Sequence, residues 1–323
     1  MFRDDKPKET IVFFPLMHVE KVYSLRNGKI GPAKSLIKSY PILQELFPAL
    51  TRSTLDGENI QEPTVAITVS SNKALLAELD CIAFLAASQP QYQAEDEIFG
   101  QKITFTTHKS EAEDLLSING FVLGPTKFIH GLRLPDFPKA YFRWDRESID
   151  RFEEFLSNAL TDELYLAIVE CLSRVDDKEA QRERSRIIIA VSLFKQAFVD
   201  LMRVRSFSGT QFILLASAFE ALLNLPSRDI RSSFENSVML LTGGETSLLK
   251  KWCQEFYDYR SNLVHGDVAW ETEDAYFELP GGKKVGHSAV ARNIFVQCLK
   301  AKLFLLGLLT NYAREELDFD SLT

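Results

Sequence analysis

The chain has 323 residues, of which 46% are hydrophobic and 25% are charged, and its formal net charge at pH 7 is -8. This composition is typical of a globular protein that is long enough for two domains. The acidic balance argues against a protein that coats nucleic acid with its whole surface, because sequence-independent phosphate binding needs a net basic surface. Any contact with nucleic acid is therefore expected to be local.

The amino-terminal part, up to about Pro138, mixes strand and turn signals. Strands are predicted where β-branched and aromatic residues cluster or alternate, at Ile11–Leu16, Lys21–Leu25, Pro63–Ser70 and Lys102–Thr107. Arg26-Asn-Gly28 is predicted to form a hairpin turn, and the segment Asn72–Ser88, rich in Ala and Leu, a helix. We therefore expect a small α+β domain over residues 1–144, which would sense a trigger or bind a partner.

Helical periodicity dominates from Trp144 onward. Apolar residues recur at three- and four-residue spacing in Asp145–Leu156, Thr161–Val175, Arg184–Arg205, Gln211–Leu225, Arg231–Leu241, Thr246–His265 and Ser288–Glu316. Thr161 is predicted to cap the second of these helices, and Pro280–Lys284 is predicted to be a loop. The sequence thus predicts an all-α domain over residues 145–323.

The targeting and redox signals favour a cytoplasmic protein without a membrane segment. The segment Ile11–Met17 is too short for the apolar region of a signal peptide and contains a proline. Lysines interrupt Ile294–Leu309 before it reaches the roughly 20 apolar residues of a membrane span, so we expect a core helix there. Reduced thiols are expected at the four widely spaced cysteines, Cys81, Cys171, Cys253 and Cys298.

The helix that ends near His265 carries the most specific pattern, Phe256-Tyr-Asp-Tyr-Arg260-Ser-Asn-Leu-Val-His265-Gly266-Asp267. It follows an apolar helix, Phe212–Leu223, whose one charged residue is Glu220. Together these segments resemble the ApeA-like branch of the HEPN superfamily, in which an arginine precedes a histidine by four to six residues in an up-and-down helical bundle. The resemblance covers roughly residues 145–323. Gly266-Asp267 departs from the antitoxin-paired HEPN toxins, which tend to carry a tyrosine two positions after the histidine.

The resemblance implies a metal-independent endoribonuclease in stress response or anti-phage defence. Arg260 and His265 would be catalytic, and the residues expected to support them are Glu220, Tyr257, Asp258, Ser261 and Asn262. No cofactor or metal is implied. The partners implied are an RNA substrate and a second copy of the chain. Two alternatives are a non-catalytic HEPN module that binds RNA or a partner protein, and a helical domain that serves mainly for dimerisation.

Helical geometry gives an independent expectation for Arg260. At about 100° per residue, the apolar arc of its helix contains Leu249, Trp252, Cys253, Phe256, Tyr259, Leu263 and Val264. Arg260 falls inside that arc, and Glu220 is the one carboxylate on an otherwise apolar helix. Because an unpaired buried charge is costly, we expect the two side chains to pair. Such a pair would serve either the site or only the cross-linking of two helices.

His265 falls in the last helical turn, which Gly266 can terminate. The partial negative charge of a helix C-terminus favours an imidazolium ion, which suits a general acid. Asn262, one turn earlier, is expected to hydrogen-bond the ring, although a simple helix cap is the alternative role for His265. RNA cleavage needs a base, an acid and a cation at the phosphate, so the single histidine of each motif favours two motifs facing one cleft.

The remaining basic residues, histidines and glycines give weaker indications of function. Basic residues that could guide RNA are Arg182, Arg184, Arg186, Lys195, Arg203, Arg205, Arg228, Arg231, Lys283 and Lys284, although interspersed acids favour a solvated face. Isolated histidines, for which we predict no metal site, are His18, His108, His130 and His287. Gly281-Gly-Lys-Lys284 lacks the glycine spacing of a phosphate-binding loop and is predicted to be a turn.

Overall fold

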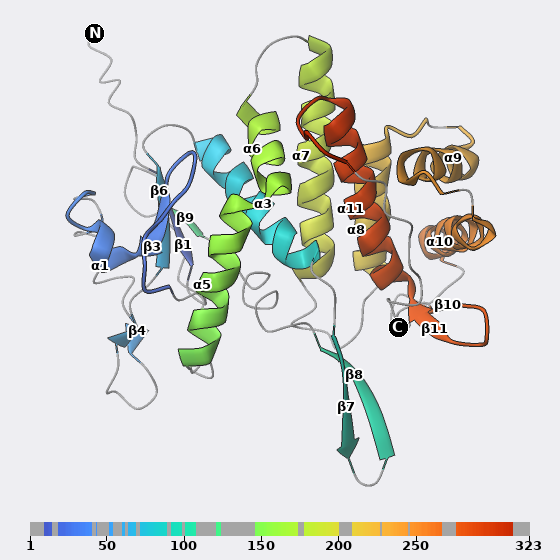
Figure 1. Ribbon diagram of the computed structural model, residues 1–323, viewed down its shortest axis with the longest axis horizontal. Helices are drawn as coiled ribbons and strands as arrows, with labels where there is room; N and C mark the ends of the chain where they lie inside the picture. The colour runs from blue at the N-terminus through green and yellow to red at the C-terminus, as the bar shows by residue number, and fades with distance from the viewer. Residues whose placement is uncertain are drawn as a thin grey trace. The chain divides into compact units, whose positions relative to one another are not determined.

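The computed structural model describes residues 10–14, 19–40, 43, 52–53, 60–61, 64–68, 72–88, 92–98, 101–107, 121–123, 146–173, 178–199, 209–226, 228–244, 246–266 and 276–312. Within these residues there are nine helices, and the strands pair antiparallel (Figure 1). The chain divides into two compact units, Met1–Ile82 with Ser117–Thr161, and Ala83–Leu116 with Asp162–Thr323. The expected combination of an α+β region with a helical part is confirmed. The predicted boundary at residues 144 and 145 lies outside the described residues.

The first unit contains a five-stranded antiparallel sheet. Its order is β2-β3-β6-β1-β9, and the strands are β1 (Thr10–Phe14), β2 (Tyr23–Ser24), β3 (Lys29–Pro32), β6 (Thr64–Thr68) and β9 (Phe121–Leu123). Val12 lies opposite Ala66 on one side and Val122 on the other. Ile11, Val12, Ala66 and Ile67 are buried, so apolar residues of neighbouring strands form the centre of the sheet.

Several smaller elements complete the first unit. They are α1 (Ala33–Leu36), the strand pair β4 (Arg52–Ser53) and β5 (Ile60–Gln61), the first part of α3 (Asn72–Ser88), and α5 (Arg146–Thr161). The predicted bounds of the helix at 72–88 are confirmed, and its residues from Ala83 onward belong to the second unit. The structure therefore groups α5, the first helix after the predicted boundary, with the sheet.

The predicted turn at Arg26-Asn-Gly28 joins β2 to β3. The backbone NH of Leu25 donates to the carbonyl oxygen of Gly28 at 2.9 Å, which closes the hairpin. A Cβ atom at Gly28 would lie 2.3 Å from the carbonyl oxygen of Ile67 and 3.2 Å from a side-chain carbon of Leu75. Glycine is therefore required here because the backbone of β6 approaches closely.

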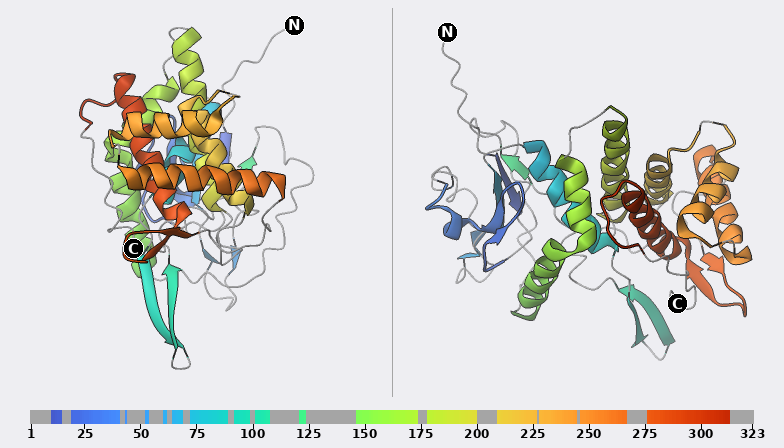
Figure 2. Two further views of the ribbon diagram at one scale, coloured as in Figure 1. Left: turned by 90° about the vertical axis from the view of Figure 1, so that its right-hand side faces the viewer. Right: turned by 45° about the horizontal axis from the view of Figure 1, so that its top comes forward.

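The second unit is mainly helical. It contains α6 (Glu163–Ser173), α7 (Lys178–Val199), α8 (Gly209–Leu223), α9 (Ile230–Thr242), α10 (Ser247–His265) and α11 (His287–Leu305). Its strand pairs are β7 (Tyr92–Ile98) with β8 (Gln101–Thr107), and β10 (Tyr276–Glu278) with β11 (Lys284–Gly286). Helices α7 and α8 pack along each other, whereas α9 and α10 run across the direction of α7 and α11 (Figure 2).

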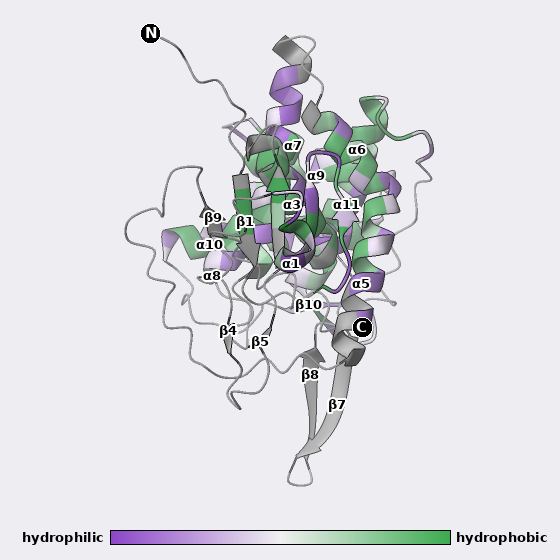
Figure 3. Ribbon diagram, turned by 90° about the vertical axis from the view of Figure 1, so that its left-hand side faces the viewer, coloured by the Kyte–Doolittle hydropathy of each residue, from purple (hydrophilic) through white to green (hydrophobic). Residues whose placement is uncertain are grey.

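Aromatic side chains form the core of the second unit. Phe194 of α7 stacks on Phe295 of α11 with ring centres 4.6 Å apart, and Phe219 of α8 meets Phe295 edge to face at 5.2 Å. Phe219 also packs on Phe256 of α10 at 5.7 Å, and Phe256 stacks on Trp252 at 4.9 Å. All five rings are fully buried, so this continuous contact fixes α10 against α8 and, through α8, to the rest of the bundle. In Figure 3 the charged first half of α7 is mostly purple.

Several predicted element boundaries are wrong. Helix α5 ends at Thr161 rather than at Leu156, and α7 begins at Lys178 rather than at Arg184. Thr161 does not cap α6; it is the last residue of α5, and its hydroxyl donates to the carbonyl oxygen of Asn158 at 3.0 Å. Asp162 caps α6 instead, accepting from the backbone NH of Leu164 at 2.7 Å, because an aspartate at this position is an equally good N-cap. The last helix ends at Leu305, since Gly307 adopts a left-handed conformation with φ 67°.

The predicted loop at Pro280–Lys284 is the tip of the β10–β11 hairpin. Gly281 and Gly282 have φ values of 89° and 81°, a conformation that glycine adopts at little cost. The predicted turn is thus confirmed, and the flanking strands were missed because each has only three residues. None of the helices in the described ranges combines the length and the apolar content that crossing a membrane requires.

Candidate functional site

The helix that carries the motif, α10, begins and ends at sequence-encoded caps. The Thr246 hydroxyl oxygen accepts from the backbone NH of Leu249 at 3.1 Å, as expected of an N-cap. Gly266 adopts φ 79°, and its backbone NH donates to the carbonyl oxygen of Leu263 at 3.3 Å. The predicted span is therefore confirmed, and His265 is the last helical residue.

Arg260 of α10 pairs with Glu220 of α8. The guanidinium Nη2 lies 3.0 Å from Oε1 of the carboxylate, so the predicted pairing is confirmed. The two side chains are 24% and 28% exposed, which is more than the deep burial that the helical pattern predicted. The pair is therefore half-buried, although Arg260 lies within the apolar arc of its helix. The Nε atom of Arg260 is nevertheless buried and has no hydrogen-bond partner among the residues that the structure describes.

Tyr257 completes this cluster. Its hydroxyl donates to the same Oε1 atom of Glu220 at 2.7 Å, and its ring centre lies 5.9 Å from the Arg260 guanidinium carbon. The side chain is buried, and burial, followed by the hydrogen bond to the Glu220 carboxylate, raises the pKa of Tyr257 far above its ordinary value. Tyr257 is therefore suited to donate a hydrogen bond and unsuited to act as a base near neutral pH.

Asp258, the neighbouring supporting residue, faces another direction. Its Oδ1 atom lies 3.0 Å from Nη1 of Arg231 on α9, and both side chains are 51% exposed. The pair links α9 to α10 at the surface, where such an interaction contributes about 0 to 1 kcal/mol. Arg231, one of the basic residues considered for guiding RNA, thus has an acidic partner.

The end of α10 presents polar residues to solvent. His265 and Asn262 are exposed, and Ser261 is half-buried. No hydrogen bond joins Asn262 to His265, both of which the structure describes, so the expected orienting contact is absent. Val264 is 47% exposed, so the expectation that it lies on the buried face of α10 is wrong.

His287 is a buried histidine whose environment no local pattern indicated. It is the first residue of α11, only 3% exposed, and its ring lies among Phe212, Trp252, Phe256 and Phe277. Burial lowers the pKa of His287 to about 4, so the imidazole is neutral at physiological pH. Its Nδ1 atom has no hydrogen-bond partner within the described part of the chain, and its Nε2 atom lies 3.9 Å from a carboxylate oxygen of Glu255. The sequence analysis predicted only that His287 is not a metal ligand and did not predict its burial.

The remaining candidates are dispersed. Arg184 is buried and so does not offer a surface charge, whereas Arg182, Arg228, Lys283 and Lys284 are exposed. Outside the described residues lie Arg203, Arg205, His18, His108 and His130. All four cysteines are buried and carry reduced thiols, and burial raises the pKa of Cys298 to about 12. Within the described ranges, no three His, Cys, Asp or Glu residues lie close enough together to hold a metal ion.

Comparisons with protein-family models, with curated proteins and with solved structures found no match to the chain. Function must therefore be inferred from the side chains of α8 and α10. These two helices bring together an arginine, a glutamate and a tyrosine at hydrogen-bond distance, with a histidine at the exposed helix end. Arginine and histidine are residue types that can bind an anion and transfer a proton, respectively.

Proposed function

We propose that this protein is a metal-independent endoribonuclease of the HEPN type, in which Arg260 and His265 act on RNA. The observation that supports the proposal most is the contrast between these two residues on one helix. Arg260 is fixed by Glu220, whereas His265, roughly 140° away around the helix axis, is exposed at the helix end. Cleavage of a phosphodiester uses a cation that stabilises the charge on the phosphate and an accessible imidazole that transfers a proton.

The proposed reaction uses the RNA itself as nucleophile. A base removes the proton of the 2′-hydroxyl, the resulting oxygen attacks phosphorus, and the bond to the 5′-oxygen breaks as an acid protonates that oxygen. The products are a 2′,3′-cyclic phosphate and a free 5′-hydroxyl. His265 would act as the acid, Arg260 would stabilise the charge on the phosphate, and His265 of a second copy would act as the base.

The second candidate function is a non-catalytic HEPN module that binds RNA or a partner protein. The observation that favours it is the neutralisation of Arg260 by Glu220, with the hydroxyl of Tyr257 on the same oxygen. An ion pair of this kind is also what a structural cross-link between α8 and α10 needs. In that case Arg260 would contribute to stability, and His265 would contribute only to binding.

The deciding experiment is incubation of the purified full-length chain with mixed RNAs in EDTA. We expect cleavage that leaves 2′,3′-cyclic phosphate ends, and a rate about 10²- to 10⁴-fold lower in His265→Ala. Ser185→Ala, an exposed polar change on α7, is the matched control and should retain the wild-type rate. Equal cleavage rates in the wild type and in His265→Ala, or a requirement for a divalent ion, would refute the proposed metal-independent ribonuclease activity. Filter binding of RNA without cleavage would support the second candidate.

A further inference from the structure

Two glutamates hold the segment Val19–Gly28 of the first unit from opposite ends. Glu153 of α5 accepts hydrogen bonds from the backbone NH groups of Glu20 and Lys21, and Glu78 of α3 accepts from those of Arg26 and Asn27. The first pair of contacts joins residues 133 and 132 positions apart, and the second joins residues 52 and 51 positions apart. Each carboxylate therefore takes two consecutive NH groups of a distant part of the chain.

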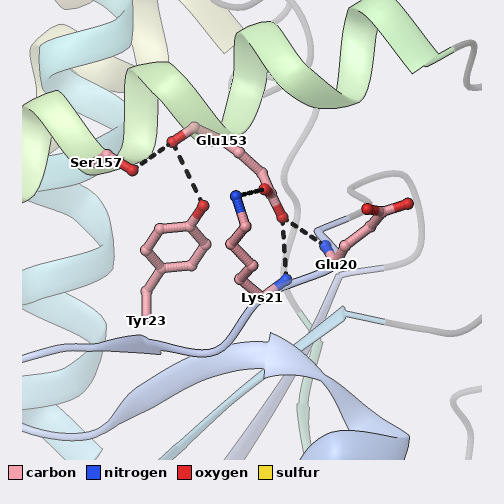
Figure 4. A network of polar contacts seen from close by, with 5 residues as sticks. All are labelled: Glu20, Lys21, Tyr23, Glu153 and Ser157. Atoms are coloured by element: carbon pink, nitrogen blue, oxygen red, sulfur yellow. Dashed lines mark hydrogen bonds and ion pairs between the residues drawn. The ribbon is translucent and has the colours of Figure 1, made fainter.

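Two backbone NH groups and one ammonium group surround the Glu153 carboxylate, as in a typical anion-binding site (Figure 4). Its Oε1 atom lies 2.6 Å from the backbone nitrogen of Glu20 and 3.0 Å from that of Lys21, and its Oε2 atom lies 3.1 Å from the Lys21 ammonium. The side chain of Glu20 points away from this contact (Figure 4). Successive backbone NH groups in a bend, completed by a cation, are a common way in which proteins bind small anions.

We propose that the Glu20–Lys21 backbone and the Lys21 ammonium form a carboxylate-binding site whose resident ligand is the Glu153 side chain. The ligand would thus be a side chain of the protein itself. Its carboxylate would hold α5 against residues Glu20 and Lys21, which precede β2. This inference concerns the first unit and does not depend on ribonuclease activity.

The backbone NH groups of Glu20 and Lys21 and the Lys21 ammonium differ in how strongly solvent screens their contact with the Glu153 carboxylate. The Glu153 side chain is 5% exposed, whereas that of Lys21 is 73% exposed, so solvent screens the ammonium far more than the two NH groups. Burial by itself would raise the pKa of Glu153, but the NH groups of Glu20 and Lys21 and the Lys21 ammonium outweigh it and hold that pKa below its ordinary value. Among the described residues, Tyr23 and Asp150 are further titratable groups near the site. The Tyr23 hydroxyl donates to the Glu153 carbonyl oxygen at 3.5 Å, and Asp150 interacts electrostatically with Lys21.

Amide hydrogen exchange of the full-length chain tests the proposal directly. In Glu153→Ala, protection of the Glu20 and Lys21 amides should fall by about 10- to 100-fold, because each loses a hydrogen bond to a charged acceptor. The amides of Arg26 and Asn27 should keep their protection, since Glu78 holds them. Glu78→Ala is the matched variant and should show the reverse pattern.

Chemical rescue then separates an anion site from an ordinary structural contact. Sodium acetate should restore protection of the Glu20 and Lys21 amides in Glu153→Ala, whereas sodium chloride at equal ionic strength should not. Glu153→Gln, whose amide fills the same space, should show no acetate effect. Equal effects of acetate and chloride, or a folded Glu153→Ala variant that acetate leaves unprotected, would overturn the proposal.

A pH series covers the case in which Glu153→Ala does not fold. Wild-type protection of the Glu20 and Lys21 amides should fall toward the level of Glu153→Gln as the pH is lowered below the ordinary glutamate pKa of 4.5. The sign follows from the lowered pKa, because a carboxylate that is stabilised when charged loses its contribution on protonation. The proposal would also be overturned if the Glu20 and Lys21 amides kept constant protection in the wild type over this pH range while the same amides were unprotected in Glu153→Gln.

Discussion

Tyr257 and Arg260, one turn apart on α10, contact the same carboxylate oxygen of Glu220. The hydroxyl donates at 2.7 Å and the guanidinium nitrogen lies at 3.0 Å. One carboxylate oxygen offers about two lone pairs, so these two contacts fill the acceptor capacity of Oε1. Arg260 and Glu220 meet through Nη2 and Oε1, whereas arginine and carboxylate often make a two-fold contact that uses both carboxylate oxygens.

The Arg260–Glu220 pair should contribute measurably to stability. We expect Glu220→Ala to lower the free energy of unfolding by about 1 to 3 kcal/mol, less than the ~3 to 5 kcal/mol of a fully buried pair, because both side chains are partly exposed. Urea denaturation followed by circular dichroism measures this change. Asp258→Asn, which breaks the surface pair with Arg231, should cost no more than about 1 kcal/mol. Equal costs of the two variants would contradict the prediction.

The hydroxyl of Tyr257 should be coupled to Glu220. Tyr257→Phe keeps the buried ring and removes one hydrogen bond to a charged acceptor, so we expect a loss of about 1.5 to 3 kcal/mol in the free energy of unfolding. Tyr312→Phe removes a hydroxyl that donates to the neutral carbonyl oxygen of Leu241 at 3.1 Å and should cost about 1 kcal/mol. In a double-mutant cycle of Tyr257→Phe with Glu220→Gln, strictly additive losses would show that the contact is not formed.

His287 should make the stability depend on pH between about 6.5 and 4. Burial lowers the pKa of His287 from 6.5 to about 4, so over this range the unfolded chain binds a proton that the folded chain does not. The stability that depends on a neutral imidazole is therefore complete above pH 6.5 and is lost as the pH falls to 4, by about 3 kcal/mol in total.

Replacing the buried ring isolates this effect. His287→Phe should unfold with a smaller loss of stability between pH 7 and pH 5 than the wild type, whose loss from this group is about 2 kcal/mol. Ser185→Ala, which removes an exposed hydroxyl of α7, is the control and should keep the wild-type pH dependence. If His287→Phe and the wild type lost the same free energy over this interval, His287 would not be responsible.

Gly28 should not tolerate even one added carbon. Gly28→Ala places a Cβ atom 2.3 Å from the carbonyl oxygen of Ile67, so the β2–β3 hairpin must shift away from β6. We expect a loss of about 1 to 3 kcal/mol, as for other overpacked positions. The control is Gly244→Ala, whose added carbon would lie 3.8 Å from its nearest neighbour, a side-chain carbon of Leu249. A Gly28→Ala variant as stable as this control would contradict the close approach.

The proposed reaction requires a homodimer through the helical unit. Light scattering should give a dimer mass at micromolar concentration, because one histidine per chain must serve as base and its symmetry mate as acid. Mixed dimers that carry one His265→Ala chain should lose activity at their shared site. A strictly monomeric chain that still cleaves RNA would refute this arrangement. The second proton-transfer group would then have to be Asp258, since the raised pKa of Tyr257 disfavours it as a base.

Local sequence signals predicted those elements that local physics determines. The bounds of α3, the turn at Arg26–Gly28 and the span of α10 agree with the prediction, because periodicity, a tight turn and caps act within a few residues. The Glu220–Arg260 pair was also predictable, since each residue is a charge on an apolar face that only an opposite charge can compensate. The roles of Arg260 and His265 in cleavage stay predictions.

Only the tertiary structure decided the contacts between distant residues. Periodicity did not indicate that Tyr257 turns inward to Glu220, that His287 is enclosed by four aromatic rings, or that Glu153 reaches a backbone segment more than 130 residues away. It also led to the expectation of a contact between Asn262 and His265 that is absent between these described residues. The physical reason is that a helix face specifies which residues seek burial, whereas the partner that meets each of them depends on how whole helices and strands pack.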